Sequence, residues 1–496
     1  MIDSTSWASI APEIVLLVMA CAIALIDLWV KSPKRNLTYV LSLATSLVVA
    51  YMSAQAALTE TTIYGFSHMV VSDPVGNWLK CFAAIGTAIT MVYGRPYSAD
   101  RDMLRGGEYF TLSLFSLLGI YVMVGSSNFL VLYMGLELLT LSGYGLVALR
   151  RDNGIATEAA IKYFVLGALA SGFLLYGISM LYGATGTLDI VEVFRELAQK
   201  DYQKTVLIFA LVFVVAGLAF KLGVVPFHMW VPDVYQGAPT SITLLIGGAP
   251  KIAAFAIMIR LLVQGLLPLA FDWQLMLMVL AIMSLLVGNL AAIAQTNIKR
   301  MLAFSTISQM GFLLIGLMSG VVNSNTTGAA NAYSSSMFYV VAYVLTTLAT
   351  FGVIMVLART GFESEEISDF AGLNQVNPFL AAVMSICMFS LAGIPPMIGF
   401  YAKLSVLQAL IDTGITANLY LAIFAVMMSL IGAFYYLRVV KVMYFDAPIT
   451  ASAQVIPLDV KVVLAINGLL VLVIGIWPNG LLDLCGHAFS KLLGLA

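Results

Sequence analysis

Long apolar runs, each close to the length that crosses a lipid bilayer, fill most of this sequence. A hydrocarbon core of about 30 Å needs about 20 helical residues, because a helix rises about 1.5 Å per residue. By that measure about fourteen runs qualify, and they cover residues 10–30, 38–57, 74–93, 108–125, 127–149, 161–182, 204–225, 240–263, 274–295, 299–320, 332–357, 378–412, 418–441 and 461–481. No run alternates with period two for the length of a barrel strand, so we predict one all-α polytopic membrane domain, residues 1–496.

The composition excludes a soluble globular protein of this length. Hydrophobic residues make up 61% of the chain and charged residues only 10%, and the mean hydropathy is +0.99. A formal net charge of -1 offers no basic surface, which excludes nucleic acid as a partner. We therefore expect the surroundings of the chain to be the lipid bilayer and other membrane proteins.

Cysteine and histidine residues are scattered along the chain and form no recognisable metal-binding pattern. Neither residue type shows the close spacing typical of zinc, haem or iron–sulfur ligands. The residues concerned are Cys21, Cys81, Cys387, Cys485, His68, His228 and His487. The sequence therefore predicts no metal site and no cofactor held by this chain.

The distribution of Lys and Arg between the loops predicts the orientation in the membrane. Cytoplasmic loops carry an excess of these residues. With the N-terminus outside, most of them fall on one side, and the opposite side receives mainly Arg195, Lys200, Lys204, Arg260 and Lys491. We therefore predict that both termini face the periplasm and that the number of spans is even.

Two apolar stretches are too long and too rich in Gly and Pro to be single straight helices. Residues 378–412 would form a helix of about 50 Å at about 1.5 Å per residue. Residues 204–232 present the same problem. Proline removes a helical hydrogen bond and kinks or breaks a helix. We predict breaks in the seventh and twelfth spans at Gly223, Pro226, Gly393, Pro395 and Pro396.

The two predicted breaks are separated by five spans, which suggests an internal duplication. Five is odd, so a repeated unit of five helices would return in the inverted orientation, as in many transporters. We predict repeats over residues 108–263 and 274–441. The alternative interpretation is two unrelated hinge prolines.

Four charged residues lie near the centre of predicted spans, where loops and interfaces do not explain them: Glu137, Lys221, Lys251 and Lys403. Insertion scales give a cost of about 2.5–3.5 kcal/mol for each such charge, so intramembrane ionisable residues are functional candidates by default. The alternatives are a structural salt bridge for Glu137 and an interfacial, snorkelling Lys221.

Polar neighbours of these charges are candidate connectors. Thr140 and Tyr144 follow Glu137 at i+3 and i+7 and should form one polar stripe that faces the bundle interior. Lys251 directly follows Pro250, and we expect Thr243 and Gly247 to share its helical face. Lys403, beyond the second break, is the expected counterpart of Lys221 in the second repeat.

Further polar side chains extend the set of possible connectors. Ser305 and Gln309 lie in the tenth span, where Gln relays hydrogen bonds but does not titrate near neutral pH. A polar helix-packing contact is the equally weighted alternative for Gln309. His228, Asp233 and Tyr235 lie where the chain leaves the seventh span on the predicted cytoplasmic side. They are either a proton entrance or interfacial anchors.

Taken together, these segments resemble the antiporter-like membrane subunits of complex I, the proton-pumping NADH:quinone oxidoreductase. The resemblance covers essentially the whole chain. It rests on Gly-Leu-Glu137, on Lys221 ahead of Gly-Val-Val-Pro-Phe-His-Met-Trp-Val-Pro-Asp233, on Ala-Pro-Lys251, on Asn297-Ile-Lys-Arg-Met-Leu-Ala-Phe-Ser-Thr-Ile-Ser-Gln-Met-Gly311, and on Gly-Ile-Pro-Pro396 with Lys403. The chain lacks the long lateral helix of the L-type and has Lys403 where the M-type usually has Glu, so the N-type is the most similar branch.

The resemblance implies a function and a set of partners. It implies a proton relay through Glu137, Lys221, Lys251 and Lys403, from cytoplasm to periplasm across the bacterial inner membrane. FMN, iron–sulfur clusters and quinone would belong to partner subunits, and another antiporter-like subunit would be a neighbour. Many relatives have His where this chain has Gln309. The alternative interpretation is a subunit of an Mrp-type cation/proton antiporter.

Overall fold

A computed structural model describes residues 4–199, 204–322, 325–359, 361–448 and 456–494, so Lys200 lies outside the described residues. The elements are α1 (Ser4–Ser9), α2 (Ala11–Asp27), α3 (Asn36–Leu58), β1 (Ile63–Gly65), β2 (Val70–Ser72), α4 (Pro74–Ala99), α5 (Glu108–Val124), α6 (Phe129–Val147), α7 (Gly154–Thr185), α8 (Ile190–Gln199), α9 (Lys204–Leu222), α10 (Trp230–Gly237), α11 (Thr240–Gly247), α12 (Ala249–Met258), η1 (Ile259–Gly265), η2 (Leu267–Leu269), α13 (Ala270–Ile293), α14 (Ile298–Met318), α15 (Ala329–Leu357), η3 (Ile367–Phe370), α16 (Leu373–Val376), α17 (Pro378–Ala392), α18 (Ile398–Ile411), α19 (Thr416–Phe445), α20 (Leu458–Ile476) and α21 (Asn479–Leu492).

The predicted class, an all-helical membrane protein, is confirmed. Within the described residues 11 helices are long and apolar enough to cross a membrane, and α5, α17 and α18 are shorter apolar helices. Each predicted apolar run coincides with at least one helix. Helices satisfy every backbone hydrogen bond internally, which lipid requires. The number of crossings stays a prediction, because α5, α17 and α18, with 17, 15 and 14 residues, are each shorter than the roughly 20 residues that a full crossing takes.

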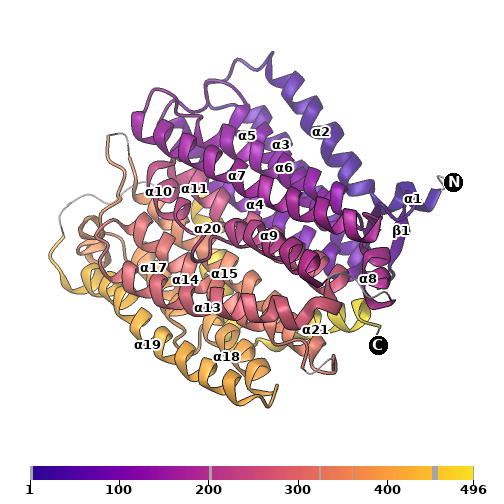
Figure 1. Ribbon diagram of the computed structural model, residues 1–496. Coiled ribbons are helices and arrows are strands. Elements are labelled where there is room, and N and C mark those ends of the chain that lie inside the picture. The colour runs from indigo at the N-terminus through magenta and orange to yellow at the C-terminus, as the bar shows by residue number, and fades with distance from the viewer. Residues whose placement is uncertain (1–3, 200–203, 323–324, 360, 449–455, 495–496) are drawn as a thin grey trace.

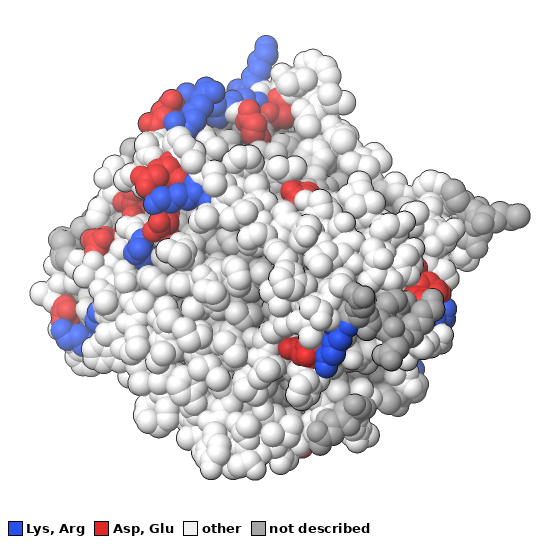
Figure 2. Space-filling model, in the orientation of Figure 1, with Lys and Arg blue, Asp and Glu red and all other residues white. Residues whose placement is uncertain are grey.

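The helices form one bundle in which the two halves of the chain lie side by side (Figure 1). Helices α4 and α15 pack against each other between the halves, and α15 also packs against α17 and α18. In the view of Figure 2, charged side chains gather toward the two ends of the bundle and leave a nearly uncharged belt between them. That belt has the character expected of a lipid-facing surface.

The predicted helix breaks in the seventh and twelfth spans are confirmed. Helix α9 ends at Leu222 before α10 begins at Trp230, and α17 ends at Ala392 before α18 begins at Ile398. Gly223 and Gly393 take φ values of 75° and 87°, a left-handed conformation that glycine adopts without a steric penalty. Each glycine N–H donates to the carbonyls three and four residues earlier.

The two breaks are alike in further detail. The peptide bonds before Pro226 and Pro396 are both cis. Val224 and Ile394, which directly follow the glycines, both donate their N–H groups to the carbonyl five residues earlier. Such similarity is what the predicted inverted repeats, 108–263 and 274–441, would produce. The repeats themselves stay a prediction.

The eighth span differs from the expectation. The uninterrupted helix that we predicted through Lys251 is wrong, because α11 ends at Gly247 and α12 begins at Ala249. Gly248 between them has φ of -97° and ψ of -109°, outside the helical range. Pro250 then occupies the first turn of α12, where its missing N–H does no harm. Lys251 therefore belongs to a broken span of its own.

The positions of the termini test the predicted orientation in part. Both ends of the chain lie at the same end of the bundle (Figure 1), as an even number of crossings requires. Reporter fusions at Asp152 and at Thr326, which five spans separate, decide the absolute orientation. We expect the fusion at Asp152 to report cytoplasm and the fusion at Thr326 to report periplasm, because Lys and Arg gather on the first side. The reverse pattern would invert the topology.

Candidate functional site

The Lys251 side chain reaches from α12 to the broken end of α9. Lys251 is 1% exposed. Its Nζ donates to the carbonyl of Leu222 at 2.8 Å and lies 3.5 Å from the carbonyl of Lys221. The last carbonyls of a helix lack intrahelical partners and carry the negative end of the helix dipole. The break in α9 therefore supplies the acceptors that hold a buried ammonium group.

Lys403 is held in the same way in the other half of the chain. From α18 its Nζ donates to the carbonyls of Leu391 and Ala392, the last residues of α17, at 2.9 and 3.1 Å. A third bond reaches Ser429 Oγ at 2.9 Å. In its contacts Lys403 therefore matches Lys251. The expected correspondence of Lys403 with Lys221 in the repeats stays a prediction. The contacts of the two lysines differ, because Lys221 lies before its own break and bonds Ser171.

Lys221 and Glu137 lie on neighbouring helices without forming an ion pair. Lys221, in the last turn of α9, donates to Ser171 Oγ on α7 at 3.3 Å. Glu137 on α6 is partly buried, and its Oε1 has no hydrogen-bond partner among the described residues. Glu137 nevertheless acts electrostatically on the Lys221 ammonium. The charges of the two side chains are thus within electrostatic reach of each other.

A small internal cavity joins Lys221 to Lys251. It has a volume of about 40 Å³ and is lined by residues of several helices, among them Thr140 of α6, Lys221 of α9, Trp230 of α10 and Lys251 of α12. A site needs roughly 10–15 Å³ of such volume to hold a water molecule. The cavity is therefore large enough for water between the two lysines, and Thr140 lies on its wall as the predicted polar stripe requires.

The two connectors that follow Glu137 are both buried. Thr140 donates to the carbonyl of Leu136 at 2.9 Å, so its hydroxyl is held by its own helix. The Tyr144 ring packs edge-on against Tyr163 with centroids 4.8 Å apart. The predicted inward-facing stripe is therefore present, and its aromatic end packs against α7.

Gln309 and Lys403 donate hydrogen bonds to the same carbonyl, that of Leu391. Gln309 Nε2 donates to Leu391 O at 3.0 Å and to the hydroxyl of Tyr436 at 3.0 Å. Tyr436 is in turn 2.5 Å from Ser305 Oγ, and the Tyr339 hydroxyl donates to Gln309 Oε1. The structure thus brings Ser305 and Gln309 to Lys403. Sequence reasoning missed both tyrosines, because aromatic residues inside a span are usually packing residues.

Asp233 lies among cations at the outer edge of the bundle. Its carboxylate is 2.8 Å from Lys162 Nζ and 2.8 Å from an Arg300 nitrogen. Burial alone would raise the pKa of Asp233, but the hydrogen bonds from Lys162 and Arg300 hold that pKa below its usual range. His228 makes no comparable contact through Nδ1, which is buried without a partner among the described residues. Of these two connectors, only Asp233 belongs to a network.

The structure buries more charges than the sequence suggested. Four buried cations each pair with a carboxylate from a distant part of the chain, at 2.5, 3.0, 2.5 and 2.9 Å: Lys80 with Glu13, Arg101 with Glu363, Arg260 with Asp73, and Lys299 with Glu365. Sequence reasoning had assigned Arg101, Arg260 and Lys299 to the two sides of the membrane and had not considered Lys80. The signal that could have found Lys80 was its place within the apolar run 74–93.

Comparisons with known proteins agree with this architecture. A family profile described as "NADH:quinone oxidoreductase/Mrp antiporter, TM" matches residues 126–432. NADH-quinone oxidoreductase subunit N of Polaromonas naphthalenivorans (strain CJ2) is 67% identical over 99% of both chains. The subunit of the same name from Herminiimonas arsenicoxydans is 59% identical over 98% of both chains.

Solved structures are similar over the same length. A chain of "Respiratory complex I from Thermus thermophilus with bound Aureothin" has a TM-score of 0.77 and 28% identity, covering 95% of this chain and 98% of that one. A chain of the Mrp complex from Dietzia sp. DQ12-45-1b has a TM-score of 0.84 at 21% identity, covering 98% of this chain and 97% of that one. The second likeness indicates the shared fold alone.

Proposed function

The chain belongs to the family of NADH-quinone oxidoreductase subunit N, and from that premise we propose that it moves protons through a relay of buried lysines. In this proposal the direction is from the cytoplasm to the periplasm of a bacterial inner membrane. Electron transfer through FMN, iron–sulfur clusters and quinone takes place in partner subunits, one of which is another antiporter-like subunit. This chain supplies the proton path.

One contrast among the buried cations carries the proposal. Lys80 and Arg260 each have a carboxylate partner that is itself buried, Glu13 and Asp73 respectively. Within the described part of the chain, the buried Lys251 and Lys403 and the half-buried Lys221 have hydrogen bonds to carbonyls and hydroxyls but no ion pair. A paired lysine that loses its proton strands a buried carboxylate, which is costly. An unpaired lysine can lose and regain a proton without that cost.

In the proposed relay a proton passes along these residues in turn. Glu137 favours the ammonium form of Lys221 when it approaches, and its withdrawal releases a proton toward the cavity shared with Lys251. Lys403 receives the proton in the second half of the chain. Gln309, bonded to the same Leu391 carbonyl as Lys403, orders the path without storing a proton.

The relay needs an external source of energy. Moving one elementary charge against about 100 mV costs about 2.3 kcal/mol. In this proposal the energy comes from the redox subunits. It reaches this chain as a conformational or electrostatic change. Such a change biases a relay only if it acts differently on the two positions of Glu137.

Replacing Glu137 with Gln tests the first step. The amide keeps the shape of the carboxylate but removes the charge that acts on Lys221. We expect the Glu137→Gln complex to assemble and to pump protons several-fold more slowly, measured as proton uptake by inside-out vesicles during NADH oxidation. Glu108→Gln, at an exposed carboxylate in the first turn of α5, is the matched control. Parental pumping by an assembled Glu137→Gln complex would reduce Glu137 to a structural role.

A further inference from the structure

A large charged hollow opens at one end of the bundle. It has a volume of about 920 Å³ and is lined by the ends of α4, α6 and α7 and by segment 361–365. We name it the vestibule. Its charged lining includes Arg101, Arg105, Arg150, Asp152, Glu363 and Glu365. The arginines are among the residues that place this end in the cytoplasm under the predicted orientation.

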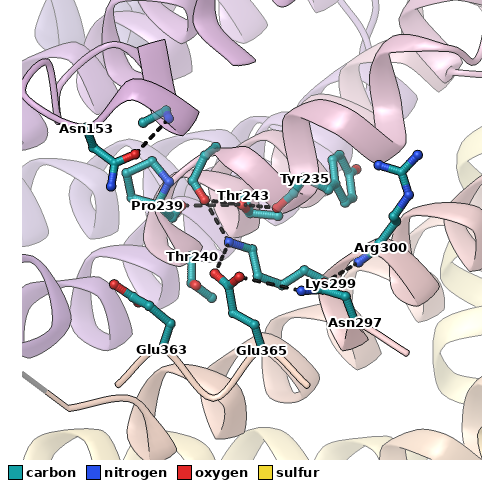
Figure 3. A network of polar contacts seen from close by, with 12 residues as sticks. Asn153, Tyr235, Pro239, Thr240, Thr243, Asn297, Lys299, Arg300, Glu363 and Glu365 are labelled. Carbon is teal, nitrogen blue, oxygen red and sulfur yellow. Dashed lines mark hydrogen bonds and ion pairs between the residues drawn. The ribbon is translucent and has the colours of Figure 1, made fainter. Parts of the chain in front are cut away.

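Lys299 lies directly beneath the floor of the vestibule. Its Nζ donates to Glu365 Oε1 at 2.9 Å and to the carbonyl of Ala238 at 2.8 Å. The Glu365 side chain is 28% exposed and the Lys299 side chain 1% exposed. Figure 3 shows Lys299 between Glu365 and the segment that carries Pro239 and Thr240. Glu365 therefore meets vestibule water, while Lys299 is closed off from it.

Polar groups continue from Lys299 toward the interior. The carbonyl of Ala238 also lies 3.4 Å from Thr243 Oγ1, which donates to the carbonyl of Tyr235 at 3.0 Å. The Tyr235 hydroxyl is buried without a partner among the described residues. The Tyr235 hydroxyl faces α11 at Gly247, which has no side chain. A Cβ atom added at Gly247 would lie 3.0 Å from the hydroxyl oxygen. The break before Lys251 begins at the next residue, Gly248.

Two buried hydroxyls on this line have no hydrogen-bond partner in the described structure: Tyr235 OH and Thr240 Oγ1. Leaving a buried hydroxyl unpaired is costly, and native proteins usually satisfy such groups with protein or water partners. Buried water typically binds otherwise unsatisfied polar groups of this kind. The surroundings of Lys299, Thr243 and Tyr235 are thus suited to hold water.

We propose that Glu365 and Lys299 form the proton uptake gate of this chain, at the floor of the vestibule, and that Thr243 and Tyr235 connect the gate to Lys251. The inference rests on the proposed relay. The Lys299 ammonium gives a proton inward and becomes a neutral amine. Glu365 takes a proton from vestibule water and passes it to that amine. One proton has then moved, and the carboxylate and the ammonium are restored.

The competing role for this pair is purely structural, because Lys299–Glu365 also tethers segment 361–365 to α14. Chemical rescue separates the two roles. Glu365→Gln keeps an oxygen that accepts a hydrogen bond from Lys299 but cannot carry a proton. Imidazole is small enough for a hollow of about 920 Å³ and donates protons near neutral pH, so it replaces a missing proton carrier and not a missing tether.

The test measures NADH:quinone turnover by the full complex in uncoupled inside-out vesicles, whose outer face carries the vestibule. We expect Glu365→Gln to lower turnover several-fold and added imidazole to restore most of it, relative to the parent with the same imidazole. Asp152→Asn, at a vestibule carboxylate whose side chain is 79% exposed, is the control and should match the parent. Parental turnover by Glu365→Gln, or a loss that imidazole does not restore, overturns the gate.

A second variant decides the inference if Glu365→Gln does not assemble. Thr243→Val removes the inner hydroxyl and keeps the shape, so turnover should fall and imidazole in the vestibule should not restore it. Parental turnover by that variant overturns the path. Lys251→Met serves as the reference for the relay itself. If it pumps normally, the proposed function fails. If it is impaired while Glu365→Gln and Thr243→Val match the parent, only the gate is wrong.

Discussion

Replacing Lys251 with Met is expected to leave the complex assembled and to remove most of its proton pumping. Methionine keeps the length of the side chain and removes the cost of inserting a charge, about 2.5–3.5 kcal/mol. The lost hydrogen bond to Leu222 O works against assembly by about 1.5–3 kcal/mol, a typical contribution of a bond from a charged group. The two changes offset each other, while the proton carrier at the centre of the relay is gone.

Lys251→Arg separates charge from proton exchange at the same position. Arginine keeps a positive charge near the broken end of α9 but does not deprotonate in proteins. We therefore expect Lys251→Arg to pump as poorly as Lys251→Met. Subunit content of the membrane and proton uptake by vesicles measure the two properties separately, and Lys31→Met, in an exposed loop, is the control. Full pumping by an assembled Lys251→Met complex would contradict the relay.

Breaking the Asp73–Arg260 pair is expected to have the largest effect on stability. The two side chains are 0% and 4% exposed and 2.5 Å apart. Removing one partner of a buried pair leaves an uncompensated charge and typically costs about 3–5 kcal/mol of folding free energy. Arg260→Met strands Asp73, and Asp73→Asn strands Arg260. Either variant should lower the amount of subunit in the membrane and its thermal stability.

The double variant is the decisive control for this pair. Asn at position 73 keeps a side-chain oxygen for the Gly76 N–H, which Asp73 caps at 2.7 Å, and Asn is as good an N-cap as Asp. Asp73→Asn with Arg260→Met leaves no stranded charge, so it should be more stable than either single variant. A double variant that loses as much as the two single losses combined would show that the side chains act independently.

The sequence was sufficient for the features that depend on a short stretch of chain. An apolar run of about 20 residues predicts a membrane helix whatever it packs against. Gly223 with Pro226, and Gly393 with Pro396, predict breaks because their effect on the backbone is local. Glu137, Lys221, Lys251 and Lys403 stood out because each is a lone charge within an apolar run.

The contacts of those charges could not be read from the sequence, because they join distant segments. Lys251 bonds a carbonyl 29 residues away, and Glu13 lies 67 residues from Lys80. Which charge finds a carboxylate is therefore decided by packing. Gly248 was missed for another reason. Proline in the first turn of a helix and proline inside one give the same sequence pattern, and only the backbone at Gly248 shows that a new helix begins there.

Whether the lysines form one relay in series is tested most directly by the number of protons moved per NADH oxidised. The measurement compares Lys251→Met, Lys403→Met and the double variant in sealed vesicles with normally assembled complex. Residues that act as a unit are strongly non-additive, so the double variant should lose no more protons per NADH than either single variant. The relay would be contradicted if each single variant lost only part of the protons moved per NADH and the double variant lost clearly more than either. Lys251 and Lys403 would then serve separate paths.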